Sequence, residues 1–149
     1  MPYQKFKELR VWQEAKKLAT DIYELTSHQK FSKDYGLKSQ IQRAAVSIAS
    51  NIAEGYEKTN KDFIRYLLIA KGSVAELRTQ LEISFEVGYI DKDVYEKIED
   101  QGEKINAMLI NLIKVRNNNT RIITARESNS KLSDRSAVLP LNRKNNASD

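Results

Sequence analysis

The feature that most constrains this sequence is that almost nothing in it breaks a helix. The chain has 149 residues but only two prolines, Pro2 and Pro140, and both lie near its ends. Proline removes a backbone donor and clashes with the preceding turn, so its absence from about residue 6 to residue 117 leaves long helices free to form. Apolar residues recur at steps of three and four in four segments, and no stretch alternates like a strand. The sequence therefore predicts an all-α fold.

Four helices are predicted from this spacing, over Lys7–Ser27, Tyr35–Glu57, Thr59–Val87 and Lys92–Arg116. Thr59 with Asp62 three residues later resembles a capping box at the start of the third helix. Gly88-Tyr89-Ile90 predicts a turn, and Asp91 is a suitable N-cap for the fourth helix. Helices of this length joined by short loops are typical of an up-down-up-down four-helix bundle, which we expect over residues 1–116.

The composition changes at residue 117. From there to residue 149 the chain is rich in Asn, Ser, Arg and Lys, and Ile122 and Ile123 are isolated apolar residues. A segment that buries little apolar surface does not offset its loss of conformational entropy on folding. We therefore predict that residues 117–149 form a polar, largely disordered tail.

The residue inventory argues against a membrane protein, a metalloprotein or an enzyme. No stretch is apolar enough to span a bilayer, and the first five residues lack the apolar run of a secretory signal, so a cytoplasmic protein is expected. The chain has no cysteine and one histidine, His28, which leaves no basis for a metal site or other cofactor. Glu54 and Glu76 are possible carboxylate partners, but no nucleophile and base accompany them. We expect a protein without catalytic activity.

Charge suggests one class of partner. The net charge is +5, and residues 1–80 hold 14 Lys and Arg against 9 Asp and Glu. Such an excess suits a polyanion, although the same net charge is also ordinary for solubility. The basic residues that we predict to contact nucleic acid are Arg10, Lys16, Lys17, Lys38, Arg43, Lys58, Lys61, Arg65 and Arg78.

A row of polar residues follows one side of the second and third helices. On a helical wheel of the second helix they fill an arc beside the apolar stripe, flanked by alanines. Three interpretations stay open: a half-buried seam that fixes helix register, a ligand or RNA groove, or a polar subunit interface. Because a buried charge persists only when paired, Arg43 is expected to pair with Glu76 or Glu54. The predicted polar seam comprises Gln40, Arg43, Ser47, Asn51, Glu54, Ser73, Glu76 and Gln80.

The start of the third helix is apolar nearly all round. A helix that packs on one core needs a single apolar stripe, and surplus apolar surface usually marks a protein interface. The sequence therefore predicts a homo-oligomer. The residues concerned are Phe63, Ile64, Tyr66, Leu67, Leu68, Ile69 and Ala70.

The second helix also carries a family signature, because residues 40–55 read QIQRAAVSIASNIAEG. This stretch closely resembles the four-helix bundle proteins encoded in intervening sequences of bacterial 23S rRNA genes. The likeness spans about residues 6–115 and includes Leu9, Val11-Trp12 and Gly88-Tyr89-Ile90. In the third helix it continues through Phe63, Leu67, Ala70, Gly72, Ser73, Glu76, Leu77, Gln80 and Leu81.

The resemblance implies a four-helix bundle whose relatives assemble into pentameric rings. Related accessory proteins of diversity-generating retroelements bind a reverse transcriptase and nucleic acid through a basic surface. Our leading hypothesis is an oligomeric module that binds structured RNA, or other nucleic acid, by neutralising phosphates. The alternative is a protein-interaction subunit, such as a reverse-transcriptase accessory or a scaffold, with no nucleic-acid role of its own.

Overall fold

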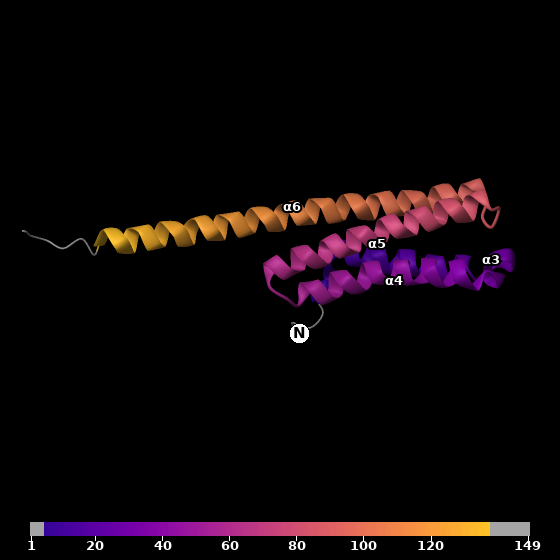
Figure 1. Cartoon of the computed structure of the whole chain (residues 1–149), viewed down its shortest axis with the longest axis horizontal. Helices are drawn as coiled ribbons and strands as arrows, with labels where there is room; N and C mark the ends of the chain where they lie inside the picture. The colour runs from indigo at the N-terminus through magenta and orange to yellow at the C-terminus, as the bar shows by residue number, and fades with distance from the viewer. Residues whose placement is uncertain (1–4, 138–149) are drawn as a thin grey trace, which may run out of the picture.

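The computed structural model describes residues 5–137, and helices make up nearly all of that range (Figure 1). The all-α prediction is confirmed, and no strand occurs in this part of the chain. Six helices are present there, not four: the four long helices that were predicted and two short ones. They are α1 (Lys5–Glu8), α2 (Arg10–Leu25), α3 (Gln29–Lys33), α4 (Tyr35–Tyr56), α5 (Asn60–Glu86) and α6 (Lys92–Ala137).

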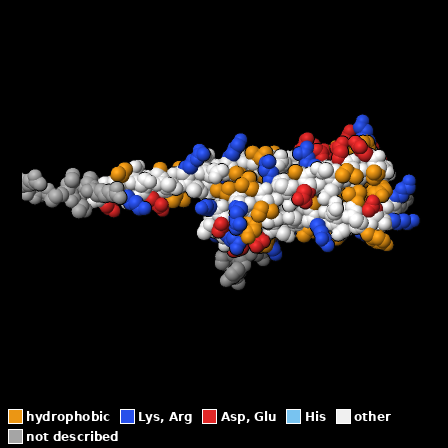
Figure 2. All heavy atoms as spheres, viewed as in Figure 1, with side chains coloured by type: hydrophobic (Ala, Val, Ile, Leu, Met, Phe, Trp, Pro, Cys, Tyr) orange, Lys and Arg blue, Asp and Glu red, His pale blue; other side chains and the backbone are white. Residues whose placement is uncertain are grey.

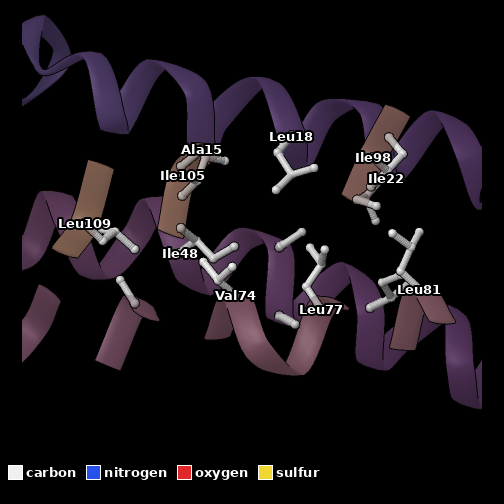
Figure 3. Close-up of a cluster of buried hydrophobic side chains, with 14 of the residues drawn as sticks. Ala15, Leu18, Ile22, Ile48, Val74, Leu77, Leu81, Ile98, Ile105 and Leu109 are labelled. Carbon is white, nitrogen blue, oxygen red and sulfur yellow. The ribbon is translucent and has the colours of Figure 1, made fainter. Parts of the chain in front are cut away.

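The four long helices share one apolar core. α2 packs against α4, α4 against α5, α5 against α6, and α6 returns to α2. Each contributes side chains that are fully buried, for example Leu18 from α2, Ile48 from α4, Leu77 from α5 and Ile105 from α6. These side chains point toward one another in Figure 3. We call residues 5–116, where this packing occurs, the helical body.

Two short helices, α1 and α3, were not predicted from the sequence. The first predicted helix, Lys7–Ser27, is interrupted at Leu9, whose backbone is extended, and this break separates α1 from α2. The predicted loop before the second helix contains α3, because Phe31 is buried there and packs against Tyr89 with ring centroids 5.4 Å apart. That contact anchors the α2–α4 connection to the turn before α6.

The predicted starts of the third and fourth helices agree with the structure. Thr59 caps α5 by accepting a hydrogen bond from the Asp62 backbone N–H at 3.3 Å. Asp91 caps α6 in the same way, with the Val94 N–H 2.8 Å from its Oδ1. Gly88 has φ of 81°, a left-handed conformation that costs glycine little, and it forms the predicted turn between α5 and α6. These caps fix the helices that place the charged residues described below.

The prediction of a disordered tail from residue 117 is wrong for residues 117–137, which continue α6. No proline or glycine occurs between Gly102 and Pro140, so nothing in the backbone chemistry ends the helix. The result is a helix of 46 residues that extends well past the helical body (Figure 1). The rest of the predicted tail, residues 138–149, lies outside the described residues. We call residues 121–137 the α6 arm.

The hydrogen bonds of Asp34 are expected to make the stability of the fold depend on pH. The Leu37 backbone N–H donates to its Oδ1 at 3.1 Å and the Tyr89 hydroxyl to its Oδ2 at 2.9 Å, and these two bonds lower the pKa of Asp34 below its ordinary 3.8. A lowered carboxyl pKa stabilises the folded state above the ordinary pKa, and the stabilisation is lost as the pH falls through the folded pKa.

Asp34→Ala is therefore expected to lower the melting temperature at pH 7 by about 2–4 °C, the size of a typical lost cap. The difference from wild type should shrink as the pH falls below about 4, as measured by circular dichroism melts across the pH range. A difference that is as large at pH 3 as at pH 7 would contradict this role for the carboxylate.

Candidate nucleic-acid interface

Charged residues are segregated along the helical body. The end where α2 begins and α4 passes into α5 holds eight basic residues and four acidic ones, Glu8, Glu54, Glu57 and Asp62. Arg10 of α2 lines a surface hollow there with Asn111 of α6, and Asn60 at the start of α5 bonds to Arg116 of α6, so these three helices meet at this end. We call this end the basic end, and its basic residues are Lys5, Lys7, Arg10, Lys58, Lys61, Arg65, Lys114 and Arg116.

Two of the predicted cations converge on one aromatic ring at the basic end. The Lys58 ammonium lies 5.7 Å from the centroid of the Tyr66 ring, and the Arg65 guanidinium carbon lies 5.3 Å from it. The Tyr66 hydroxyl donates to Glu54 at 3.2 Å, which holds the ring in place. Arg65 also lies 3.9 Å from Asp62, but both side chains are exposed, and such surface pairs contribute little. Lys58 and Arg65 therefore remain accessible to an external anion.

Arg116 of α6 completes this cluster and was missing from the sequence prediction. Its guanidinium carbon lies 5.0 Å above the Phe63 ring centroid, and Nη1 lies 3.5 Å from Oδ1 of Asn60. Asn60 in turn donates to the Arg116 carbonyl oxygen at 2.9 Å, so α6 is fastened to the start of α5. The basic end thus combines loop, α5 and α6 cations in one region.

The opposite end of the body is acidic. Tyr95 there donates to Glu82, and this bond, with burial and the charge of Glu82, raises the pKa of Tyr95 to about 12. In Figure 2 acidic side chains gather at the end where α6 begins. The acidic residues of this end are Asp21, Glu24, Asp34, Glu82, Glu86, Asp91, Asp93, Glu96, Glu99, Asp100 and Glu103; its basic residues are Lys30, Lys33, Lys38, Arg78, Lys92 and Lys97.

The structure does not bring all the predicted cations together. Lys16 and Lys17 lie midway along α2, where the Lys16 ammonium is 5.2 Å from the Trp12 ring centroid. Lys38 is near the start of α4, toward the acidic end, and Arg43 lines a groove between α4 and α5. Arg10, Lys58, Lys61 and Arg65 are the predicted residues that share the basic end.

Arg78 is the predicted cation least able to bind phosphate. Its Nε donates to Glu99 at 2.9 Å, and Nη2 lies 3.5 Å from Glu103. The hydrogen bond to Glu99 raises the pKa of Arg78 further, so the guanidinium is held between two carboxylates. An incoming phosphate would have to compete with both of them.

The residues of the predicted polar seam divide into a hydrogen-bonded group between α4 and α5 and a group that lines a groove. Ser47 and Ser73 bridge α4 and α5 with their Oγ atoms 2.9 Å apart, and Asn51 donates to Ser47 Oγ at 2.9 Å. Within the described residues neither of the predicted pairs, Arg43 with Glu76 or with Glu54, forms an ion pair. Four other seam residues, Gln40, Arg43, Glu76 and Gln80, line an open groove of about 770 Å³ together with Ser47. Glu54 lies apart from this groove, where it accepts the hydrogen bond from Tyr66.

No group of three or more His, Cys, Asp or Glu side chains within residues 5–137 is placed to hold a metal ion. No helix in the same range has an apolar stretch long enough to cross a bilayer. The expectation that the protein is not an enzyme stays a prediction.

The comparison with known proteins decides the family. The model of the 23S rRNA-intervening sequence proteins matches residues 7–111, which is most of the helical body. The chain belongs to this family. Its fold resembles a crystal structure of a protein of unknown function from the S23 ribosomal protein family of Bacteroides thetaiotaomicron. That protein is 30% identical in sequence, with a TM-score of 0.65, and the match covers 70% of this chain and 98% of the other. A comparison with curated proteins gives no match.

The family match ends before the cations that α6 places at and beyond the basic end. Lys114, Arg116, Arg121 and Arg126 all follow residue 111. Sequence reasoning missed Arg121 and Arg126 because the composition from residue 117 onward predicted a tail. It missed Lys114 and Arg116 because they end a segment, residues 81–116, that holds 5 Lys and Arg against 8 Asp and Glu. The absence of proline and glycine between residues 102 and 140 was the signal that could have extended the helix.

Proposed function

We propose that this 23S rRNA-intervening sequence protein is a non-catalytic, self-associating module that binds structured RNA at its basic end. One observation carries the proposal: cations from three separate parts of the chain are gathered at one end of the body, while acidic residues occupy the other. A charge distribution of this kind steers and orients a polyanion. Because the family is named after an intervening sequence of 23S rRNA, ribosomal RNA is the polyanion that we propose.

The binding mode we propose is phosphate neutralisation on a helical framework. In it α2, α4, α5 and the first half of α6 act as a four-helix bundle that presents Lys58, Lys61 and Arg65 from one loop and one helix start. Arg10 and Arg116 flank them. RNA recognised in this way is read by backbone shape more than by sequence, because duplex RNA hides its major-groove base edges.

Fluorescence anisotropy of the purified protein with labelled ribosomal RNA hairpins tests this proposal. About five phosphate contacts give a slope of log K against log salt of about −4. Binding in the micromolar range or tighter, retained at physiological salt with such a slope, supports the proposal. Binding that disappears at physiological salt contradicts it and means that the net charge serves solubility alone.

Self-association is proposed through the exposed side of α5. Ile69 and Ile83 are exposed large apolar residues on this side, and Gly72 and Glu76 lie between them. A Cβ added at Gly72 would meet no atom within 4 Å, so nothing inside the chain requires glycine there. Because glycine inside a helix costs about 0.5–1 kcal/mol relative to alanine, we propose that a neighbouring copy approaches this backbone closely. Glu76, without an ion pair in the described residues, is available to Arg43 of that copy.

Gly72→Ala is expected to have two opposite effects. It should stabilise the dissociated protein by about 0.5–1 kcal/mol through helix propensity, and it should weaken self-association because the added methyl obstructs the close approach. Denaturant melts at low protein concentration measure the first effect, and sedimentation velocity measures the second. Gly36→Ala, at another exposed helical glycine, is the matched control and should leave association unchanged. Equal association constants for wild type and Gly72→Ala would contradict this interface.

The alternative, a protein-interaction accessory or scaffold subunit, is favoured by the same exposed face. Ile69, Gly72 and Ile83 would then receive a different protein. A protein that stays monomeric in sedimentation and does not bind RNA at physiological salt would support this alternative over the proposal above.

A further inference from the structure

The α6 arm is the least enclosed part of the described chain. The last hydrogen bonds from α6 to another helix join Arg116 and Thr120 to Asn60 of α5. Beyond them every side chain from Arg121 to Asp134 is exposed. In Figure 1 this stretch projects past the α4–α5 loop, so the arm begins at the basic end and leads away from it. Tertiary packing therefore does not explain why the arm is helical.

The arm lacks the apolar stripe that a second helix would cover. Its large apolar residues, Ile122, Ile123 and Leu132, are 51%, 53% and 61% exposed. Ile123 and Leu132 are nine positions apart, which at about 100° per residue places them on opposite sides of the helix. A helix partner buries residues that share one face. This arrangement argues against a hydrophobic protein partner.

The polar side chains of the arm instead suit a phosphate backbone. Arg121, Arg126 and Lys131 are exposed cations against the carboxylates of Glu127 and Asp134. Between them lie Asn, Ser and Thr residues that donate hydrogen bonds to phosphate and sugar oxygens. With a rise of about 1.5 Å per residue, the three cations extend over about 15 Å of helix. Since five positions turn a helix by about 140°, they place positive charge on three sides of the arm, beyond Lys114 and Arg116 of the basic end.

We infer that the α6 arm is a second RNA-contacting element, whose cations contact phosphates of a structured RNA seated on the basic end. This inference rests on the proposed function and adds to it a separate part of the chain. An isolated helix of this length is marginally stable in water, so RNA that neutralises the arm also stabilises its helical form. The arm thereby lengthens the binding site without enlarging the helical body.

The test compares two full-length variants that lose the same charge. The arm variant carries Arg121→Gln, Arg126→Gln and Lys131→Gln, and the control carries Lys30→Gln, Lys33→Gln and Lys92→Gln near the acidic end. Affinity for a labelled ribosomal RNA hairpin is measured by anisotropy from low to physiological salt. Circular dichroism melts of both variants check that the helical body is folded.

The arm variant is expected to bind about tenfold more weakly than wild type at physiological salt, with a salt slope smaller in magnitude by about 1–2. The control should change affinity by less than about threefold. Equal affinities for the two variants, with wild-type binding intact, would overturn the arm inference and leave the basic end as the site. No binding by wild type would overturn both. Unchanged RNA affinity with an altered sedimentation coefficient would assign the arm to contacts between copies and also overturn the inference.

Discussion

Reversing three charges at the basic end, with Lys58→Glu, Lys61→Glu and Arg65→Glu together, is expected to weaken binding to ribosomal RNA by at least about 100-fold at physiological salt. The change removes up to three phosphate contacts and puts three carboxylates in their place, so attraction becomes repulsion. The effect on folding should be small, because Lys58, Lys61 and Arg65 are all exposed and the only ion pair among them, Arg65 with Asp62, is a surface pair.

The matched control reverses Lys30, Lys33 and Lys92 to Glu. It changes the net charge by the same amount at the end of the body that is already acidic, so a site at the basic end predicts a loss of affinity smaller than about fivefold. Anisotropy titrations at one fixed salt concentration compare the two. Similar losses for both triple variants would mean that total charge, and not the basic end, determines binding.

Gly55→Val is expected to cause the largest loss of stability, about 3 kcal/mol, at the upper end of what overpacking usually costs. Gly55 is buried where α4 meets α5, and even a Cβ there would lie 2.5 Å from Cβ of Tyr66 and 3.0 Å from Cδ2 of Phe63. Both neighbouring side chains stand on α5, so the added atoms force the two helices apart. Urea unfolding followed by circular dichroism measures the change.

The same substitution should also weaken RNA binding, because Tyr66 supports Lys58 and Arg65 and Phe63 supports Arg116. Gly72→Ala, where a Cβ meets nothing, is the contrasting helical glycine in the same chain. Wild-type stability for Gly55→Val would contradict the close approach of α4 and α5 at this position.

The helical segments of the body were predictable because their chemistry is local. Thr59 and Asp91 cap helices with side chains that bond three residues further along, and the apolar steps of three and four act within a single helix. The short α3 was not predictable in this way. Its order depends on the contact between Phe31 and Tyr89, residues far apart in the chain.

The candidate site was only partly predictable for the same reason. Arg10, Lys58, Lys61 and Arg65 were identified as cations, but that they share one end of the body depends on how the helices run. Arg78 looked equivalent in the sequence, and only the structure shows Glu99 and Glu103 beside it. Arg116 was overlooked because it ends a net acidic segment, and its place beside Phe63 and Asn60 depends on how α6 packs against α5.

Ultraviolet crosslinking of the full-length protein to a labelled ribosomal RNA hairpin, followed by mass spectrometry of the crosslinked peptides, tests the central claim most directly. An interface at the basic end and along the arm predicts crosslinks within residues 5–12 and 56–66, where the partly exposed rings of Trp12 and Tyr66 lie near cations, and within residues 111–131. Crosslinks concentrated within residues 82–103, at the acidic end, or no crosslinks under conditions where the RNA is bound, would contradict it.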